Sequence, residues 1–87
     1  MKTHEAVTKR IMTLCNEKGI TVNGLAHLSA IPPSTIKNII YGVSKNPGIT
    51  TIKMICDGLN ISLIDFFDDE IFKSLEQEIE WNLQILY

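Results

Sequence analysis

Hydrophobic residues recur every three or four positions along most of the chain, which is the spacing of one face of an α helix. In the first such stretch, Val7, Ile11 and Leu14 follow this spacing, and Gly19 can end the helix in the left-handed conformation. No stretch alternates convincingly between hydrophobic and polar residues with the period of two that indicates a strand. The pattern therefore predicts an all-α fold.

Residues that favour helix ends divide this pattern into separate helices. Thr21 and Ser62 each carry a hydroxyl that can accept a hydrogen bond from the first amides of a helix. Pro32 and Pro33 suit the start of a helix, because the amides there have no acceptor within the helix. On these grounds we expect five helices in one domain over residues 1–67, beginning near residue 3, after Thr21, at Pro33, near residue 49 and after Ser62.

The composition fits one small domain. The chain has 87 residues, of which 45% are hydrophobic and 21% are charged, and this is enough for a modest core. Its apolar stretches are too short to span a bilayer, and the first residues lack the apolar run of a secretion signal. Two cysteines in such a chain are expected to be reduced thiols, so the sequence predicts a cytoplasmic protein without membrane association.

No residue pattern in the sequence indicates catalysis. His4 and His27 lie far apart, and neither has a cysteine or a second histidine at the spacing of metal ligands. Cys15 and Cys56 have apolar neighbours, which is typical of buried cysteines. The sequence also lacks a glycine-rich phosphate loop and the common serine and zinc hydrolase motifs. We therefore expect no enzyme activity, no metal site and no cofactor.

Charge divides the chain into two opposed parts. The net charge of −2 by itself argues against a nucleic-acid partner. Residues 1–53, however, contain seven basic and two acidic side chains and have a net charge of +5. Residues 54–87 contain one basic and eight acidic side chains and have a net charge of −7. This asymmetry favours a basic binding surface joined to an acidic one.

Residues 21–42 carry the most informative pattern. They predict two short helices joined by a tight turn, and the second helix has small polar residues on its exposed side: Ser34, Thr35, Lys37 and Asn38. Hydroxyls and amides at a helix start can bind phosphates, and serine and asparagine side chains can reach base edges. A solvated helix face would have the same composition, so this pattern alone leaves both interpretations open.

The chain resembles the Cro/repressor-type helix-turn-helix domain, often called the Xre family, over about residues 7–67. The resemblance rests on T-V-N-G-L-A-H-L-S-A-I-P-P-S-T-I-K-N-I-I-Y-G at 21–42 and on K-N-P-G-I-T-T-I-K-M-I-C-D-G-L-N-I-S-L-I-D-F-F at 45–67. It implies a five-helix, lambda-repressor-like domain whose third helix, residues 33–41, enters the major groove of DNA. It also implies a homodimer bound to a two-fold operator.

The resemblance further implies roles for individual residues. Contacts with base edges would come from the third helix, at Pro33, Ser34, Lys37 and Asn38. Contacts with phosphates would come from the start of the second helix, the third helix and the loop after it, at Thr21, Asn23, Thr35, Tyr41, Lys45 and Asn46. One departure from the family pattern is Val22, which stands where many relatives have a glutamine that binds a phosphate.

Residues 68–87 lie beyond this resemblance and predict a sixth, acidic and amphipathic helix. Its hydrophobic positions, with one polar residue among them, are spaced three and four apart as in a coiled coil: Phe72, Leu75, Ile79, Asn82 and Leu86. Three interpretations of this helix stay open. It packs on its own domain, it pairs two copies of the chain as a dimerisation element, or it binds another protein.

These observations predict a small cytoplasmic, homodimeric transcription regulator, such as a repressor, that binds a double-stranded DNA operator. The alternative is a protein-interaction module on the same fold. Such a module, antitoxin-like or regulated by a partner, would act through the acidic C-terminal helix.

Overall fold

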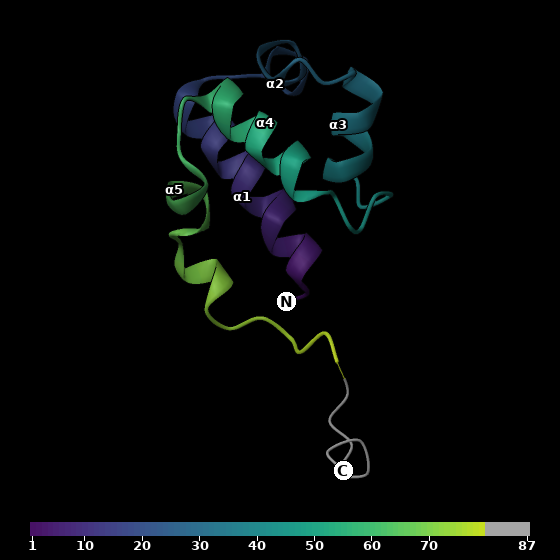
Figure 1. Cartoon of the computed structure of the whole chain (residues 1–87), viewed down its shortest axis with the longest axis vertical. Helices are drawn as coiled ribbons and strands as arrows, with labels where there is room; N and C mark the ends of the chain where they lie inside the picture. The colour runs from purple at the N-terminus through teal and green to yellow at the C-terminus, as the bar shows by residue number, and fades with distance from the viewer. Residues whose placement is uncertain (80–87) are drawn as a thin grey trace.

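Six helical elements follow one another along residues 1–79, which are the residues that the computed structural model describes (Figure 1). They are α1 (Thr3–Lys18), α2 (Val22–Ser29), α3 (Pro33–Ile40), α4 (Ile49–Leu59), α5 (Leu63–Phe67) and a short 3-10 helix, η1 (Glu70–Phe72). No strand occurs among these residues, and none of their helices is long and apolar enough to cross a membrane. The all-α fold class and the five expected α helices are confirmed.

The helix ends follow the capping residues that the sequence suggested. Gly19 ends α1 in the left-handed conformation with a φ of 64°, as expected, and the structure shows that Asn60 ends α4 in the same way with a φ of 57°. The hydroxyl oxygen of Thr21 accepts a hydrogen bond of 3.0 Å from the amide three residues later, and so does that of Ser62. Because each of these interactions is local, the boundaries follow from the nearby residues alone.

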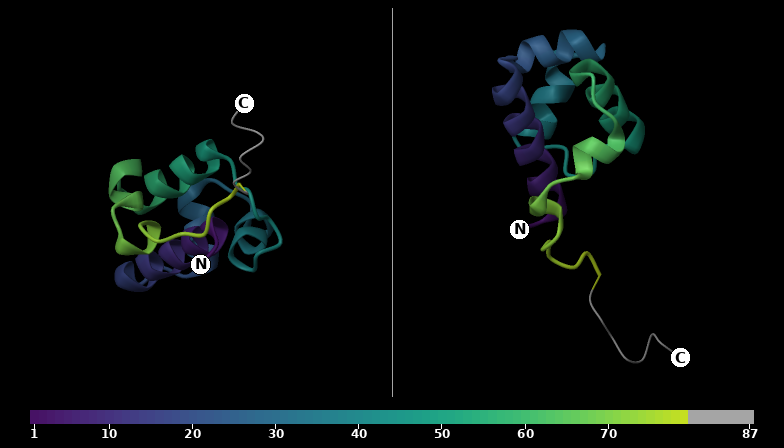
Figure 2. Two further views of the ribbon diagram at one scale, coloured as in Figure 1. Left: turned by 90° about the horizontal axis from the view of Figure 1, so that it is seen from below. Right: turned by 90° about the vertical axis from the view of Figure 1, so that its left-hand side faces the viewer.

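All five α helices contribute buried side chains to one hydrophobic core. Figure 2 shows α1 and α4 on opposite sides of this core, and its right-hand view shows α2 across their upper end. The largest fully buried hydrophobic side chains are Phe66, Ile11, Leu25, Ile36, Ile55 and Leu59. The core therefore fixes the position of α3 relative to the other helices through side chains such as Ile36.

Arg10 links α1 to the end of the helical domain. Its Nε donates a hydrogen bond to the carbonyl oxygen of Phe66 over 2.8 Å, and its Nη2 donates one to that of Asp65 over 2.9 Å. Its Nη1 also forms an ion pair with the carboxylate of Asp69 at 3.2 Å. The side chain of Arg10 is only 12% exposed, so this contact holds α5 and the residues after it against α1.

The sixth α helix expected over residues 68–87 is absent from the part of that segment that the structure describes. Residues 70–72 form one 3-10 turn, and residues 73–79 are not helical. The physical reason is that side chains and backbone amides of residues 69–76 make contacts with other parts of the domain or with nearby backbone atoms, and these contacts replace those of a continuous helix. The carboxylate of Asp69 accepts a hydrogen bond from the amide of Ile71, the ring of Phe72 lies 5.0 Å from that of Phe67, and the amide of Glu76 donates to the carbonyl oxygen of Met1.

Of the hydrophobic residues with the expected coiled-coil spacing, the three that the structure describes consequently do not share one helical face. Phe72 packs against the core of its own domain, Leu75 is half-buried, and Ile79 is exposed. Asn82 and Leu86 lie outside the described residues. Dimerisation through these five positions stays a prediction, and residues 73–79, which are not helical, do not support it.

Candidate nucleic-acid interface

α2 and α3 form the helix–turn–helix unit expected over residues 21–42. Ala30 ends α2 with a left-handed φ of 54°, and Ile31, which is buried, continues the turn. Pro32 precedes α3, and its carbonyl oxygen accepts hydrogen bonds from the amides of Thr35 and Ile36. The turn is therefore short and anchored in the core, which holds the two helices in a fixed relation.

Two side chains hold α3 in the domain, and most of the others point to solvent. Ile36 and Ile39 are buried, with 1% and 3% of their surface exposed, and Ile40 is half-buried. The four residues expected to contact base edges are all exposed: Pro33, Ser34, Lys37 and Asn38. The structure thus brings these four together on one short, rigidly held helix.

The six residues expected to contact phosphates are exposed as well: Thr21, Asn23, Thr35, Tyr41, Lys45 and Asn46. They come from the start of α2, from α3 and its end, and from the loop between α3 and α4. The oxygen of the Thr21 hydroxyl already caps α2, but a hydroxyl that accepts one hydrogen bond can still donate its proton to a phosphate.

The loop after α3 is held by backbone contacts. Gly42 has a φ of 75°, which favours glycine, and the amide of Ser44 donates a hydrogen bond of 2.9 Å to the carbonyl oxygen of Asn38. This contact holds Ser44 against the last turn of α3. Lys45 and Asn46, the next two residues, therefore lie close to the end of that helix.

The C-terminal end of α3 is held by a contact with α1 that the sequence did not indicate. The hydroxyl of Thr8 in α1 donates a hydrogen bond of 3.1 Å to the carbonyl oxygen of Ile39. A hollow of about 450 Å³ lies beside it, lined by side chains of α1, among them Lys9, and by the residues that end α3, among them Tyr41. A threonine in a helical pattern carries no signal for such a distant contact, so the sequence could not reveal it.

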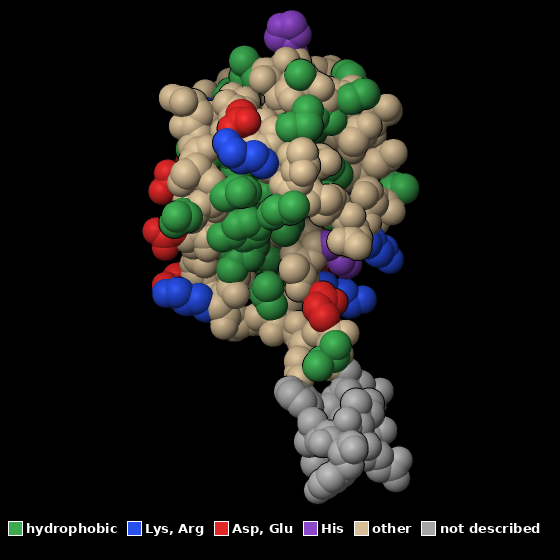
Figure 3. Space-filling model, viewed as in Figure 1, with side chains coloured by type: hydrophobic (Ala, Val, Ile, Leu, Met, Phe, Trp, Pro, Cys, Tyr) green, Lys and Arg blue, Asp and Glu red, His purple; other side chains and the backbone are tan. Residues whose placement is uncertain are grey.

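The charge around α3 suits an anionic partner. Residues 18–56 contain no aspartate or glutamate, and within residues 1–79 neither Lys37 nor Lys45 forms an ion pair. Acidic side chains gather elsewhere. In the view of Figure 3 they lie mainly along the left edge, on the side of α5, whereas α3 lies on the right in Figure 1. The acidic side chains near α5 therefore lie on the other side of the domain from α3, whereas Glu5 lines the hollow at the end of α3.

The two cysteines are structural. Cys15 and Cys56 are buried free thiols, and burial raises the pKa of each above its ordinary value. Both thiols therefore stay protonated and unreactive at neutral pH. Among residues 1–79, no three histidine, cysteine or acidic side chains come together in a group that could hold a metal ion.

Comparisons with known proteins agree with this geometry. The family model of the Cro/C1-type HTH DNA-binding domain matches residues 10–70. A solved crystal structure, that of the prophage Lp1 protein 11, superposes with a TM-score of 0.75 and is 38% identical in sequence. The similarity covers 86% of this chain and 100% of that one, whereas no curated protein matches. The chain belongs to the family of Cro/C1-type helix-turn-helix DNA-binding domains.

Proposed function

We propose that this protein is a transcription regulator that binds double-stranded DNA in a sequence-specific manner, with α3 in the major groove. The observation that carries the proposal is the exposed face of α3. Ile36 and Ile39 anchor the helix in the core, and its exposed side chains are short, polar or basic. They lie in a stretch of 39 residues, 18–56, that contains no acidic side chain.

The side chains on this face have the chemistry needed to distinguish bases. Asn38 can donate to and accept from the edge of an adenine, and Lys37 can donate to a guanine or to a phosphate. Ser34 can pair with several bases, and Pro33 can make an apolar contact with a thymine methyl group. Each good pairing discriminates against the wrong base by about 1–3 kcal/mol.

The surrounding residues would hold the domain on the DNA backbone. Lys45 supplies a positive charge that displaces counterions from the phosphates, and Thr21, Asn23, Thr35, Tyr41 and Asn46 supply neutral donors. These contacts contribute affinity and orientation without depending on the base sequence. The proposal therefore assigns specificity to α3 and general affinity to the two segments that flank it.

We also propose that two copies act together on a two-fold site in the cytoplasm. A single domain offers few base contacts. In a dimer, two α3 helices separated by about 34 Å would bind in the major groove at successive turns of the duplex. The acidic segment after α5 would then face away from the phosphates, which would repel it.

Selection from a random pool of duplexes, repeated at two salt concentrations, tests this function. Recovery of a two-fold symmetric motif is the expected result. Salt-sensitive binding without any motif would reduce the protein to a nonspecific binder and refute the assignment of α3. No binding even at low salt would refute DNA binding altogether and favour the protein-interaction module.

A further inference from the structure

An apolar groove lies between the start of α4 and α5. It has a volume of about 710 Å³ and is lined by Ile49, Leu63, Ile64, Phe67 and Asp68. A second hollow, of about 340 Å³, shares Ile49 and Phe67 with it and continues to Thr3 and His4 at the start of α1. We call the two together the α4–α5 groove. Figure 3 shows hydrophobic side chains gathered on this face of the molecule.

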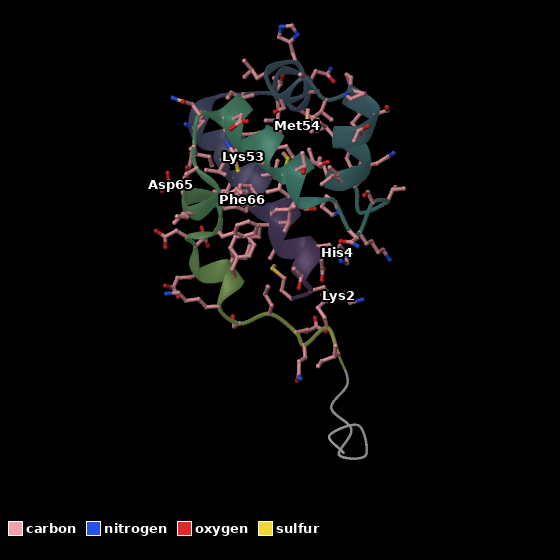
Figure 4. The ribbon with its side chains drawn as sticks, viewed as in Figure 1. Lys2, His4, Lys53, Met54, Asp65 and Phe66 are labelled. Atoms are coloured by element: carbon pink, nitrogen blue, oxygen red, sulfur yellow. The ribbon has the colours of Figure 1, made fainter. Side chains whose placement is uncertain are left out.

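The side chains of the groove are unusually exposed for their type. Ile64 is 81% exposed, Ile49 is 62% exposed, and Phe67 is 39% exposed. Figure 4 shows that the neighbouring Asp65 points away from the domain, so its charge does not lie over these side chains. Exposed apolar side chains that lie beside one another are typical of surfaces that bind another apolar group.

The chain itself leads to one end of this groove. The amide of Glu76 donates a hydrogen bond of 2.9 Å to the carbonyl oxygen of Met1, which places Glu76 beside the start of α1. Figure 2 shows residues 73–79 crossing the lower end of the molecule. Thr3 and His4, which line the nearer part of the groove, follow Met1 by only two and three residues.

The residues that come next have the composition of an apolar ligand. Residues 79–87, which we call the C-terminal segment, read I-E-W-N-L-Q-I-L-Y and contain a single charged side chain, that of Glu80. Six of these nine residues are hydrophobic or aromatic: Ile79, Trp81, Leu83, Ile85, Leu86 and Tyr87. Eleven residues after Glu76 can extend over about 36 Å, whereas an eleven-residue helix such as α4 is about 16 Å long. The segment can therefore reach the whole groove.

We propose that the C-terminal segment binds in the α4–α5 groove of its own chain. The covalent attachment of the segment to the domain favours this intramolecular binding over binding by a second copy of the protein. A segment attached by a few residues is present at an effective concentration in the millimolar range, which a second copy does not match at ordinary protein concentrations. The binding would cover Ile49, Ile64 and Phe67 and bury the side chain of Trp81.

Trp81 makes the proposal testable in the intact chain, because it is the only tryptophan. Its fluorescence in the native protein should be shifted to shorter wavelength relative to the protein unfolded in urea, and a soluble quencher should act on it several-fold less. Ile64→Lys should move both properties most of the way to their unfolded values. Since Ile64 is 81% exposed, this change should leave the helix content, measured by circular dichroism, unaltered.

Leu28→Lys is the matched control, because Leu28 is also an exposed hydrophobic residue but lies on α2, outside the groove. It should leave the fluorescence of Trp81 unchanged. A native spectrum equal to the unfolded one, or a spectrum that Ile64→Lys does not alter, would overturn the proposal. A blue shift that disappears on dilution would also overturn it and assign the groove to a second copy. None of these measurements involves DNA, so their outcome is independent of the function proposed above.

Discussion

Gly58 of α4 lies directly against Ser29 of α2. A Cβ atom at Gly58 would be 2.4 Å from the hydroxyl oxygen of Ser29, which is closer than real Cβ atoms approach, and 3.0 Å from its backbone nitrogen, which is a tight contact. Glycine is unfavourable inside a helix, by about 1 kcal/mol relative to alanine, so its presence here reflects the close approach of the two helices. α2 is the first helix of the helix–turn–helix unit. Because this contact sets the distance between α2 and α4, it also influences the position of α3.

Gly58→Ala should lower the free energy of unfolding by about 1–3 kcal/mol, because the added methyl group forces α2 and α4 apart. Denaturation in urea measures the change. Gly48→Ala is the control, since nothing lies within 4 Å of a Cβ at Gly48 and its φ of −66° suits alanine. Its expected cost is only that of replacing the N-cap glycine of α4, about 0.5 kcal/mol. Equal stability of the two variants would contradict the close contact between Gly58 and Ser29.

Arg10→Ala should also destabilise the domain, by about 2–3 kcal/mol. The change removes a guanidinium that donates to the carbonyl oxygens of Phe66 and Asp65, and it leaves the partly buried carbonyl of Phe66 without this partner. Lys9→Ala, at the exposed neighbouring position, should alter stability by no more than about 0.5 kcal/mol. If both variants unfold at the same urea concentration, the link between α1 and α5 is not stabilising.

The five α helices could be predicted because their signals are local. Hydroxyl caps such as Thr21 and left-handed residues such as Gly19 act within a few residues of the boundary that they define. The exposed side of α3 could be predicted for a similar reason, since burial of Ile36 and Ile39 turns the remaining side chains outward.

The interactions that could not be predicted are those between distant parts of the chain. Phe72 and Leu75 fit a coiled-coil spacing, but the ring of Phe72 packs on Phe67 and the core, and no local signal indicates this. In the sequence, Arg10 likewise has no feature that distinguishes it from an exposed basic residue. Only the structure shows that it contacts α5 and Asp69. Within residues 68–79, long-range packing thus overrides the periodicity, and the helical pattern in the sequence that begins there is only about two heptads long.

Lys45→Ala should weaken binding to all DNA sequences about equally, because this residue is proposed to contact a phosphate. Removing one such contact should also reduce the slope of log affinity against log salt concentration by about 0.9. Titrations of one specific and one unrelated duplex at several salt concentrations measure both effects. Lys53→Ala is the control, since Lys53 forms an ion pair with Asp57 on α4 and lies outside the proposed interface. A change of the slope in the control as large as in Lys45→Ala would show that the effect is one of net charge alone.

Asn38→Ala should instead alter which sequences are bound. The side chain amide of Asn38 is exposed on α3 and is proposed to pair with one base, so its loss should relax the preference at one position of each half-site. The affinity for the best sequence should fall by about 1–3 kcal/mol, whereas binding to unrelated duplexes and its salt dependence should stay unchanged. Asn16→Ala, an exposed asparagine near the end of α1, is the control of the same residue type and should leave the selected motif intact. A uniform loss of affinity in Asn38→Ala, with the motif unchanged, would move Asn38 from the base-contacting set to the phosphate-contacting set.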